Sequence, residues 1–129
     1  MAQIEIPKPW RDQVCAILAT ERTGVLIRWT SDAEARYEAS AAAVKLRSND
    51  NNPVWRNEIY QPFRDFLSSR QPTGCPVTME YPPGHTYEFL FPYRGETFYG
   101  KILLYQDRKR VLVLSAHLPD FDKLSCEQS

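Results

Sequence analysis

The sequence lacks, or has few of, several features that would indicate a class of function. Its 129 residues include only three cysteines, five glycines and two histidines. No apolar run approaches the roughly 18 residues that a transmembrane helix needs, and no basic segment followed by an apolar run marks a secretory signal. The three cysteines are widely spaced and lack metal-ligand spacing. This predicts reduced thiols, no metal, no cofactor and a cytoplasmic location.

The sequence also lacks an excess of either charge, with 16 basic and 16 acidic residues. Proteins that bind nucleic acids usually carry a basic excess, because contacts to phosphates supply most of their non-specific affinity. A formal net charge of zero therefore counts against a nucleic-acid partner, although it leaves room for a small, locally basic cleft.

The hydrophobic content of 43% and the length indicate one folded domain with a single core. Helical periodicity in the first half gives way to strand alternation in the second half. This order predicts an α+β fold in which N-terminal helices pack on one face of a small, mainly antiparallel twisted sheet.

Three helices are predicted in the first half. The first begins near Pro9, and the second begins at Asp32 after Ser31, which starts a capping box. The third begins at Pro53, and Pro62 is expected to kink it. The apolar positions expected in the core are Trp10, Val14, Ile17 and Leu18, then Ala33, Tyr37, Ala41 and Val44, then Trp55, Ile59, Phe63, Phe66 and Leu67.

Five short strands are predicted from alternation and turn residues. They cover residues 24–30, 77–81, 86–93, 98–106 and 110–117. Short turns separate the last four, which should therefore pair antiparallel as a meander.

The two faces of the central hairpin differ in character. A type II′ turn at residues 95–96 would place Leu90 opposite Lys101. One face would then be core, with Tyr87, Phe89, Phe91, Phe98, Gly100, Ile102 and Leu104. The other face would carry Glu88, Tyr99 and Lys101 among leucines, a mixture typical of a cleft that is covered at one end and open at the other.

The face of His117 depends on the turn at residues 107–108. A two-residue turn pairs His117 with Phe98 on the core face, whereas a one-residue bulge places it beside Tyr99 and Lys101. The sequence leaves both arrangements open.

This order of elements resembles the RelE/HigB-like ribonuclease toxins of bacterial toxin–antitoxin systems and, more distantly, the MqsR-like toxins. The segments that carry the resemblance are "YEF" at 87–89, "YRGE" at 93–96, "YGKILLY" at 99–105 and "QDRKRVLVLSAH" at 106–117. The likeness covers roughly residues 24–118, which leaves 1–23 as a helical extension and 119–129 as a polar, loosely held tail. That tail has Asp120 and Asp122 where these toxins usually have a basic run.

The resemblance implies a RelE-like fold and metal-free cleavage of mRNA, free or ribosome-bound, by attack of a 2′-hydroxyl on the adjacent phosphate. A cognate antitoxin would hold the enzyme inactive. The implied catalytic residues are Lys101, His117, Glu88 and Tyr99. The implied substrate-binding residues are Arg94, Arg108 and Arg110.

Two other functions fit the same sequence. The zero net charge and the acidic tail favour a non-enzymatic protein-interaction, adaptor or immunity module, and the aromatic-rich sheet is compatible with a small-ligand-binding domain. Each candidate also has an ordinary role: Lys101 as a surface lysine, Tyr99 in cross-strand packing, and Glu88 in an ion pair at the rim. The oligomeric state and the RNA preference do not follow from the sequence.

Overall fold

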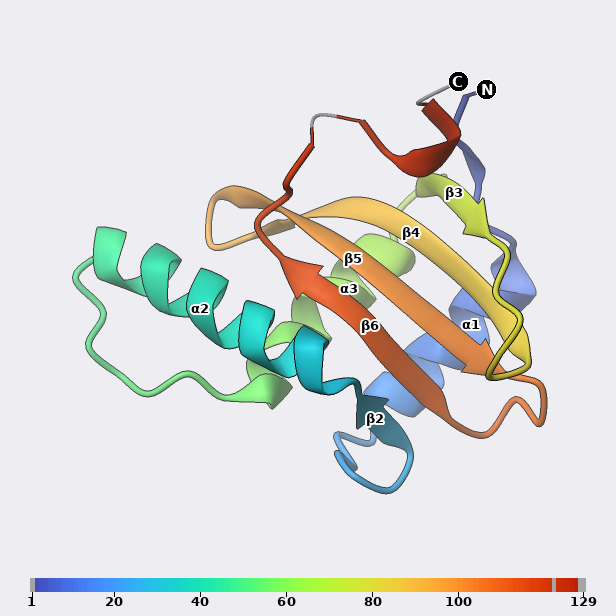
Figure 1. Ribbon diagram of the computed structural model, residues 1–129, viewed down its shortest axis with the longest axis horizontal. Coiled ribbons are helices and arrows are strands. Elements are labelled where there is room, and N and C mark those ends of the chain that lie inside the picture. The colour runs from blue at the N-terminus through green and yellow to red at the C-terminus, as the bar shows by residue number, and fades with distance from the viewer. Residues whose placement is uncertain (1, 122, 128–129) are drawn as a thin grey trace.

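The computed structural model describes residues 2–121 and 123–127, which form an α+β fold (Figure 1). In these residues the helices are α1 (Lys8–Leu18), α2 (Ser31–Arg47) and α3 (Tyr60–Leu67), with 3₁₀ turns η1 (Arg56–Ile59) and η2 (Ser125–Glu127). The strands are β1 (Ile4–Glu5), β2 (Ile27–Trp29), β3 (Thr73–Val77), β4 (Gly84–Tyr93), β5 (Glu96–Tyr105) and β6 (Val111–His117). The predicted α+β class is confirmed.

The strands form one open, mostly antiparallel sheet in the order β1-β3-β4-β5-β6-β2. Strands β3 to β6 make the predicted antiparallel meander, and β2 joins β6 in parallel. Strand β1, which was not predicted, pairs with the start of β3. The segment expected to be a helical extension thus also supplies an edge strand.

The core lies between the sheet and the helices. Helix α3 places Phe63 with its ring centroid 4.7 Å from Phe91 and 5.8 Å from Phe89, and Trp10 of α1 lies 5.0 Å from Tyr87. Figure 1 shows α1 and α3 behind the sheet and α2 running alongside β6. The predicted inward positions of the first two helices are all buried: Trp10, Val14, Ile17, Leu18, Ala33, Tyr37, Ala41 and Val44.

Two helix starts differ from the prediction. The side chain of Thr30, not Ser31, accepts the capping hydrogen bond, from the backbone N–H of Ala33 at 3.0 Å. The third helical segment begins with η1, so Pro53 does not start it. Pro62 falls in the first turn of α3, where a helix tolerates proline because the N–H of that turn has no partner within the helix.

Trp55 is not a core residue. Its side chain is 61% exposed, because the chain at Trp55 is extended and the first helical residue comes after it. The spacing of Trp55 would bury it only in a helix that had already begun at Pro53. The other expected core residues of this segment, Ile59, Phe63 and Leu67, are buried, and Phe66 is partly buried against them.

Strand β3 lies earlier than predicted, at Thr73–Val77 rather than 77–81. Pro76 and Gly74 are residue types that usually indicate a loop, yet the strand accommodates both of them. Strand β1 pairs only with Thr73 and Gly74, so Pro76 lies where β3 is an edge strand, a position that tolerates proline. A Cβ at Gly74 would lie 2.3 Å from the Glu88 carbonyl oxygen, so this position requires glycine.

The predicted register of the central hairpin was wrong by two residues. The turn is Arg94-Gly95, with φ of 50° and 79°, rather than 95–96, and Glu88 rather than Leu90 lies opposite Lys101. Two consecutive positive φ angles are the signature of a type I′ turn, which matches the twist of the strands. Because side chains alternate with a period of two, the error left every residue on its predicted face.

Candidate active site

A bulge in β6 determines where His117 lies. Tyr99 pairs with His117 and Lys101 with Ser115, but Ile102 pairs with Val113, so that Leu114 is the extra residue. The bulge shifts the end of β6 by one residue and brings His117 to the face of Tyr99 and Lys101. The sequence left open a plain two-residue turn or a one-residue bulge, and the structure has the bulge.

The four predicted catalytic residues now share one place. Glu88 of β4 lies opposite Lys101 of β5, and the ring of Tyr99 lies 5.4 Å from that of His117. All four line a cavity of about 320 Å³, within the usual size range of ligand pockets. The rest of its lining comes from Arg36, Ser115 and the segment that follows β6, namely Pro119, Asp120, Phe121, Lys123, Leu124 and Ser125.

The segment after β6, residues 118–121 and 123–127, is named the tail below. It is fastened, which contradicts the expectation of a loosely held segment. The backbone N–H of Leu118 donates to Ser40 Oγ at 3.0 Å, and Asp120 forms an ion pair with Arg36. Leu124 is only 2% exposed. In Figure 1 the tail returns from β6 across the sheet towards β3, which makes it one wall of the cavity.

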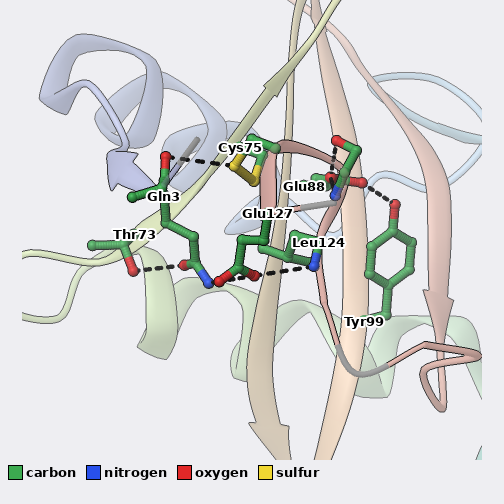
Figure 2. Close-up of a disulfide and its surroundings, with 10 residues drawn as sticks. Gln3, Thr73, Cys75, Glu88, Tyr99, Leu124 and Glu127 are labelled. Atoms are coloured by element: carbon green, nitrogen blue, oxygen red, sulfur yellow. Dashed lines mark hydrogen bonds between the residues drawn. A yellow bond between two sulfur atoms is a disulfide. The ribbon is translucent and has the colours of Figure 1, made fainter. Parts of the chain in front are cut away.

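A disulfide bond holds the far end of the tail, so the expectation of three reduced thiols was wrong. Cys75 of β3 is bonded to Cys126 of η2, with Cα atoms 5.6 Å apart (Figure 2). The two cysteines are 51 residues apart in the sequence, and only the return of the tail brings them together. Cys15 is the remaining free thiol, and burial raises its pKa.

The Glu88 carboxylate is buried and satisfied by three donors. One oxygen accepts hydrogen bonds from the backbone N–H and the hydroxyl of Ser125, and the other accepts the hydroxyl of Tyr99 (Figure 2). The residue is 4% exposed, and these donors offset the loss of water around the charge. The tail therefore completes the hydrogen bonding of a catalytic candidate.

Tyr99 retains its proton over a wide pH range. Burial raises the pKa of its phenol, and the hydrogen bond to Glu88 and the charge of that carboxylate raise it further. Tyr99 therefore serves as a hydrogen-bond donor in this site.

His117 presents one engaged and one unengaged nitrogen. Its Nδ1 lies 2.7 Å from the carbonyl oxygen of Leu118, and because a carbonyl only accepts, Nδ1 carries the hydrogen. In the neutral imidazole this assigns the lone pair to Nε2. Nε2 is buried and has no hydrogen-bond partner among the described residues. An unpartnered buried nitrogen with a free lone pair has the properties of a general base.

Two cationic side chains, Lys101 and Arg36, also line the cavity. The ammonium group of Lys101, half-buried, forms no hydrogen bond or ion pair with any described residue. Arg36 of α2 also lines the cavity and is paired with Asp120. Sequence reasoning missed Arg36. The available signal was its spacing of four residues from Ser40, on a helix edge next to the buried face, but nothing local showed that the tail would meet this edge.

The three predicted substrate-binding arginines do not line the cavity. Arg94, in the β4–β5 turn, pairs with Asp50 at 2.9 Å. Arg108, in the β5–β6 turn, donates to the carbonyl of Pro9 at 3.3 Å. The remaining one, Arg110, pairs with a carboxylate three residues away and covers the ring of Tyr105. Charged turn residues thus find partners near their own turns.

Among the described residues, no group of three or more His, Cys, Asp and Glu side chains is arranged to hold a metal ion. None of the helices in residues 2–121 and 123–127 is long and apolar enough to cross a membrane. No known protein family, curated protein or solved structure matches this chain. The site therefore has to be interpreted from its own geometry.

Proposed function

We propose that this protein is an endoribonuclease of the RelE/HigB-like toxin type that cleaves mRNA by metal-free attack of a 2′-hydroxyl. The observation that supports this proposal is the shared cavity of Glu88, Tyr99, Lys101 and His117. These residues come from three strands, and a bulge is needed to bring the last of them to the others. Bulges are common beside active sites, where they re-aim a side chain.

Three of these residues have a direct role in the proposed reaction, and Glu88 holds the hydroxyl of Tyr99 before it acts. Nε2 of His117 takes the proton of the 2′-hydroxyl, whose oxygen then attacks the adjacent phosphorus. The ammonium group of Lys101 stabilises the negative charge that builds up on the phosphoryl oxygens. Tyr99, released from Glu88, gives its proton to the departing 5′-oxygen. The products are a 2′,3′-cyclic phosphate and a 5′-hydroxyl.

The same proposal includes the other properties that the resemblance implies. The arrangement of helices on the sheet would be RelE-like, the site of action would be the cytoplasm, and a cognate antitoxin would be the protein partner. The arginines outside the cavity could contact RNA only beyond the reacting phosphate, and phosphate contacts of that kind position RNA without performing chemistry.

One observation favours a second function, a non-enzymatic interaction module. Both oxygens of Glu88 are occupied by Ser125 and Tyr99, as in a buried structural carboxylate. In that case the hydrogen bonds of the cluster would stabilise the fold, and a protein partner would bind elsewhere.

An expression experiment separates these two functions. Wild type, Lys101→Ala and His117→Ala are each expressed from an inducible promoter, and growth arrest is measured. It is paired with cleavage of RNA by purified protein in the presence of a metal chelator. We expect wild type to arrest growth and cleave RNA, and both variants to lose about 100-fold or more of the cleavage rate.

The matched controls are His85→Ala, which removes the other imidazole, exposed and outside the cavity, and Arg28→Ala, which removes an exposed cation of β2 outside the cavity. Both should retain wild-type cleavage. If folded wild type neither arrests growth nor cleaves RNA in the reduced or the oxidised state, the interaction module is the better interpretation.

A further inference from the structure

The tail both lines the cavity and occupies its functional groups. Ser125 donates two hydrogen bonds to one oxygen of Glu88, while Tyr99 donates its only proton to the other. Leu124, the residue before Ser125, is buried beside them. With the tail in this position, the carboxylate and the phenol are engaged with the protein itself, and His117 is only 3% exposed.

The disulfide bond fastens the tail beside these groups. Cys75 lies directly opposite Glu88 in the pairing of β3 with β4, so both side chains project from the same face of the sheet. The tail is therefore covalently held at both ends, by β6 at His117 and by Cys75 at Cys126. Figure 2 shows the disulfide close to Glu88 and Tyr99.

We propose that the Cys75–Cys126 disulfide is a redox latch: when oxidised, it holds the tail closed over the cavity, and its reduction frees the tail and opens the cavity to ligand. The latch regulates the site described above, and its biological use rests on the proposed ribonuclease function. In a reducing compartment the open form would prevail, and oxidation would close the site.

The step itself is a thiol–disulfide exchange with an external dithiol. A thiolate of the dithiol attacks the sulfur of Cys126, because that residue is partly exposed whereas Cys75 is fully buried. The bond between the two protein sulfurs breaks and a mixed disulfide forms. The second thiol of the dithiol then displaces Cys126, so two electrons and two protons pass to the protein and the reagent leaves as a cyclic disulfide.

The remaining contacts of the tail explain why reduction would open it. The ion pair of Asp120 with Arg36 is solvent-exposed, and such pairs stabilise little. Phe121 is 72% exposed and contributes little burial. Once the covalent tie is lost, non-covalent contacts hold the segment, among them the burial of Leu124 and the hydrogen bonds of Ser125 to Glu88, of Leu118 to Ser40 and of Gln3 to Glu127. These contacts then compete with the conformational entropy of the freed segment, and local opening becomes accessible.

Modification of the histidines by diethylpyrocarbonate tests the latch on the full chain without RNA. The reagent labels accessible imidazole nitrogens, and mass spectrometry of peptides separates His117 from His85, which is exposed and serves as an internal reference. The reaction is run on air-oxidised protein and on protein reduced with dithiothreitol, and free thiols are titrated in both. We expect one thiol before reduction and three after it. The labelling rate of His117, relative to His85, should rise by about tenfold or more.

Cys126→Ser should label His117 at the fast rate in both conditions, and Cys15→Ser should keep the response of wild type. Reduction of wild type needs no mutation, so the conclusion does not depend on the folding of any variant. Three free thiols in the oxidised protein, or an unchanged labelling ratio once Cys75 and Cys126 are reduced, would overturn the latch.

The latch and the ribonuclease can fail independently. A redox-dependent labelling ratio without RNA cleavage in either state would retain the latch and reject the proposed enzyme. Cleavage that is equal in both states, together with an unchanged ratio, would retain the enzyme and reject the latch.

Discussion

Tyr99 and His117 lie directly opposite each other on β5 and β6, with their rings 5.4 Å apart. They would point to opposite faces of the sheet without the extra residue Leu114. The tail then covers them, and its Ser125 completes the hydrogen bonding of Glu88. One bulge and one returning segment thus turn a polar sheet face into a cavity with the tail as one wall.

The raised pKa of Tyr99 predicts a late alkaline titration. Burial and the hydrogen bond to Glu88 favour the neutral phenol in the folded state, so its stabilising effect is fully present below the unfolded pKa of about 10 and is lost as the pH rises above that value. In ultraviolet difference spectra of folded protein, Tyr99→Phe should leave the ionisation step near pH 10 unchanged and diminish the later one. Tyr81→Phe, at an exposed position, should diminish the step near pH 10. The opposite pattern would contradict the described burial.

The disulfide predicts that stability depends on redox state. Closing a loop of this length typically contributes about 2–4 kcal/mol, so a reductant should lower the free energy of unfolding in urea by about that amount. Cys126→Ser should show the lower stability and no response to reductant. Cys15→Ser should still respond like wild type. A wild-type urea midpoint that is the same with and without reductant would rule out the bond.

Gly100 is predicted to be intolerant of any side chain. A Cβ there would lie 2.8 Å from a ring carbon of Phe89, 2.9 Å from Phe63 and 3.0 Å from Phe91. Gly100→Ala should therefore cost about 1–3 kcal/mol in chemical denaturation, since the three rings must shift together. Thr97→Ser, on the exposed part of the same strand, should change stability by less than about 0.5 kcal/mol. Near-equal costs would mean that the rings are loosely packed.

The contact between Arg36 and Asp120 predicts a lowered pKa for the Asp120 carboxylate in the tail. The hydrogen bond from Arg36 lowers the pKa of Asp120. The stabilisation is therefore present above the unfolded pKa of about 3.9 and is lost as the pH falls through the lower folded value. Carboxyl carbon shifts measured by NMR should show Asp120 titrating below about 3.9 in wild type and near it in Arg36→Ala. Arg28→Ala, which removes a positive charge outside the cavity, should leave the titration unchanged. A normal titration in wild type would indicate that the pair does not form in solution.

Much of the site followed from the sequence because strand alternation is local. Glu88, Tyr99 and Lys101 were assigned to one face even though the predicted pairing register was wrong by two residues, since a register shift of two preserves the face. The residue preferences of β-turns predicted the position of the β4–β5 turn less well. Arg94 adopts a positive φ, which is unfavourable for most residues other than glycine, and so a turn at 94–95 was not expected.

The incorrect predictions have both local and long-range causes. The arginines of the turns carried the right charge for phosphate, yet nearby partners engage them. Trp55 had the spacing of a core residue, but the helix begins after it. No local pattern could pair Cys75 with Cys126 or place Arg36 against Asp120, because both contacts depend on the path of the tail.

The sequence by itself determined the α+β class, the inward faces of α1 and α2 and the division of the central hairpin into an aromatic core face and a polar face. Each of these depends on a residue period of 3.6 or 2, which is a property of neighbours along the chain. The tertiary structure alone decided the register, the bulge that turns His117 to Tyr99, and the path of the tail that forms one wall of the cavity. These features depend on the free energy of contacts between residues far apart in the sequence, such as the burial of Leu124 and the bond between Cys75 and Cys126, which no local pattern encodes.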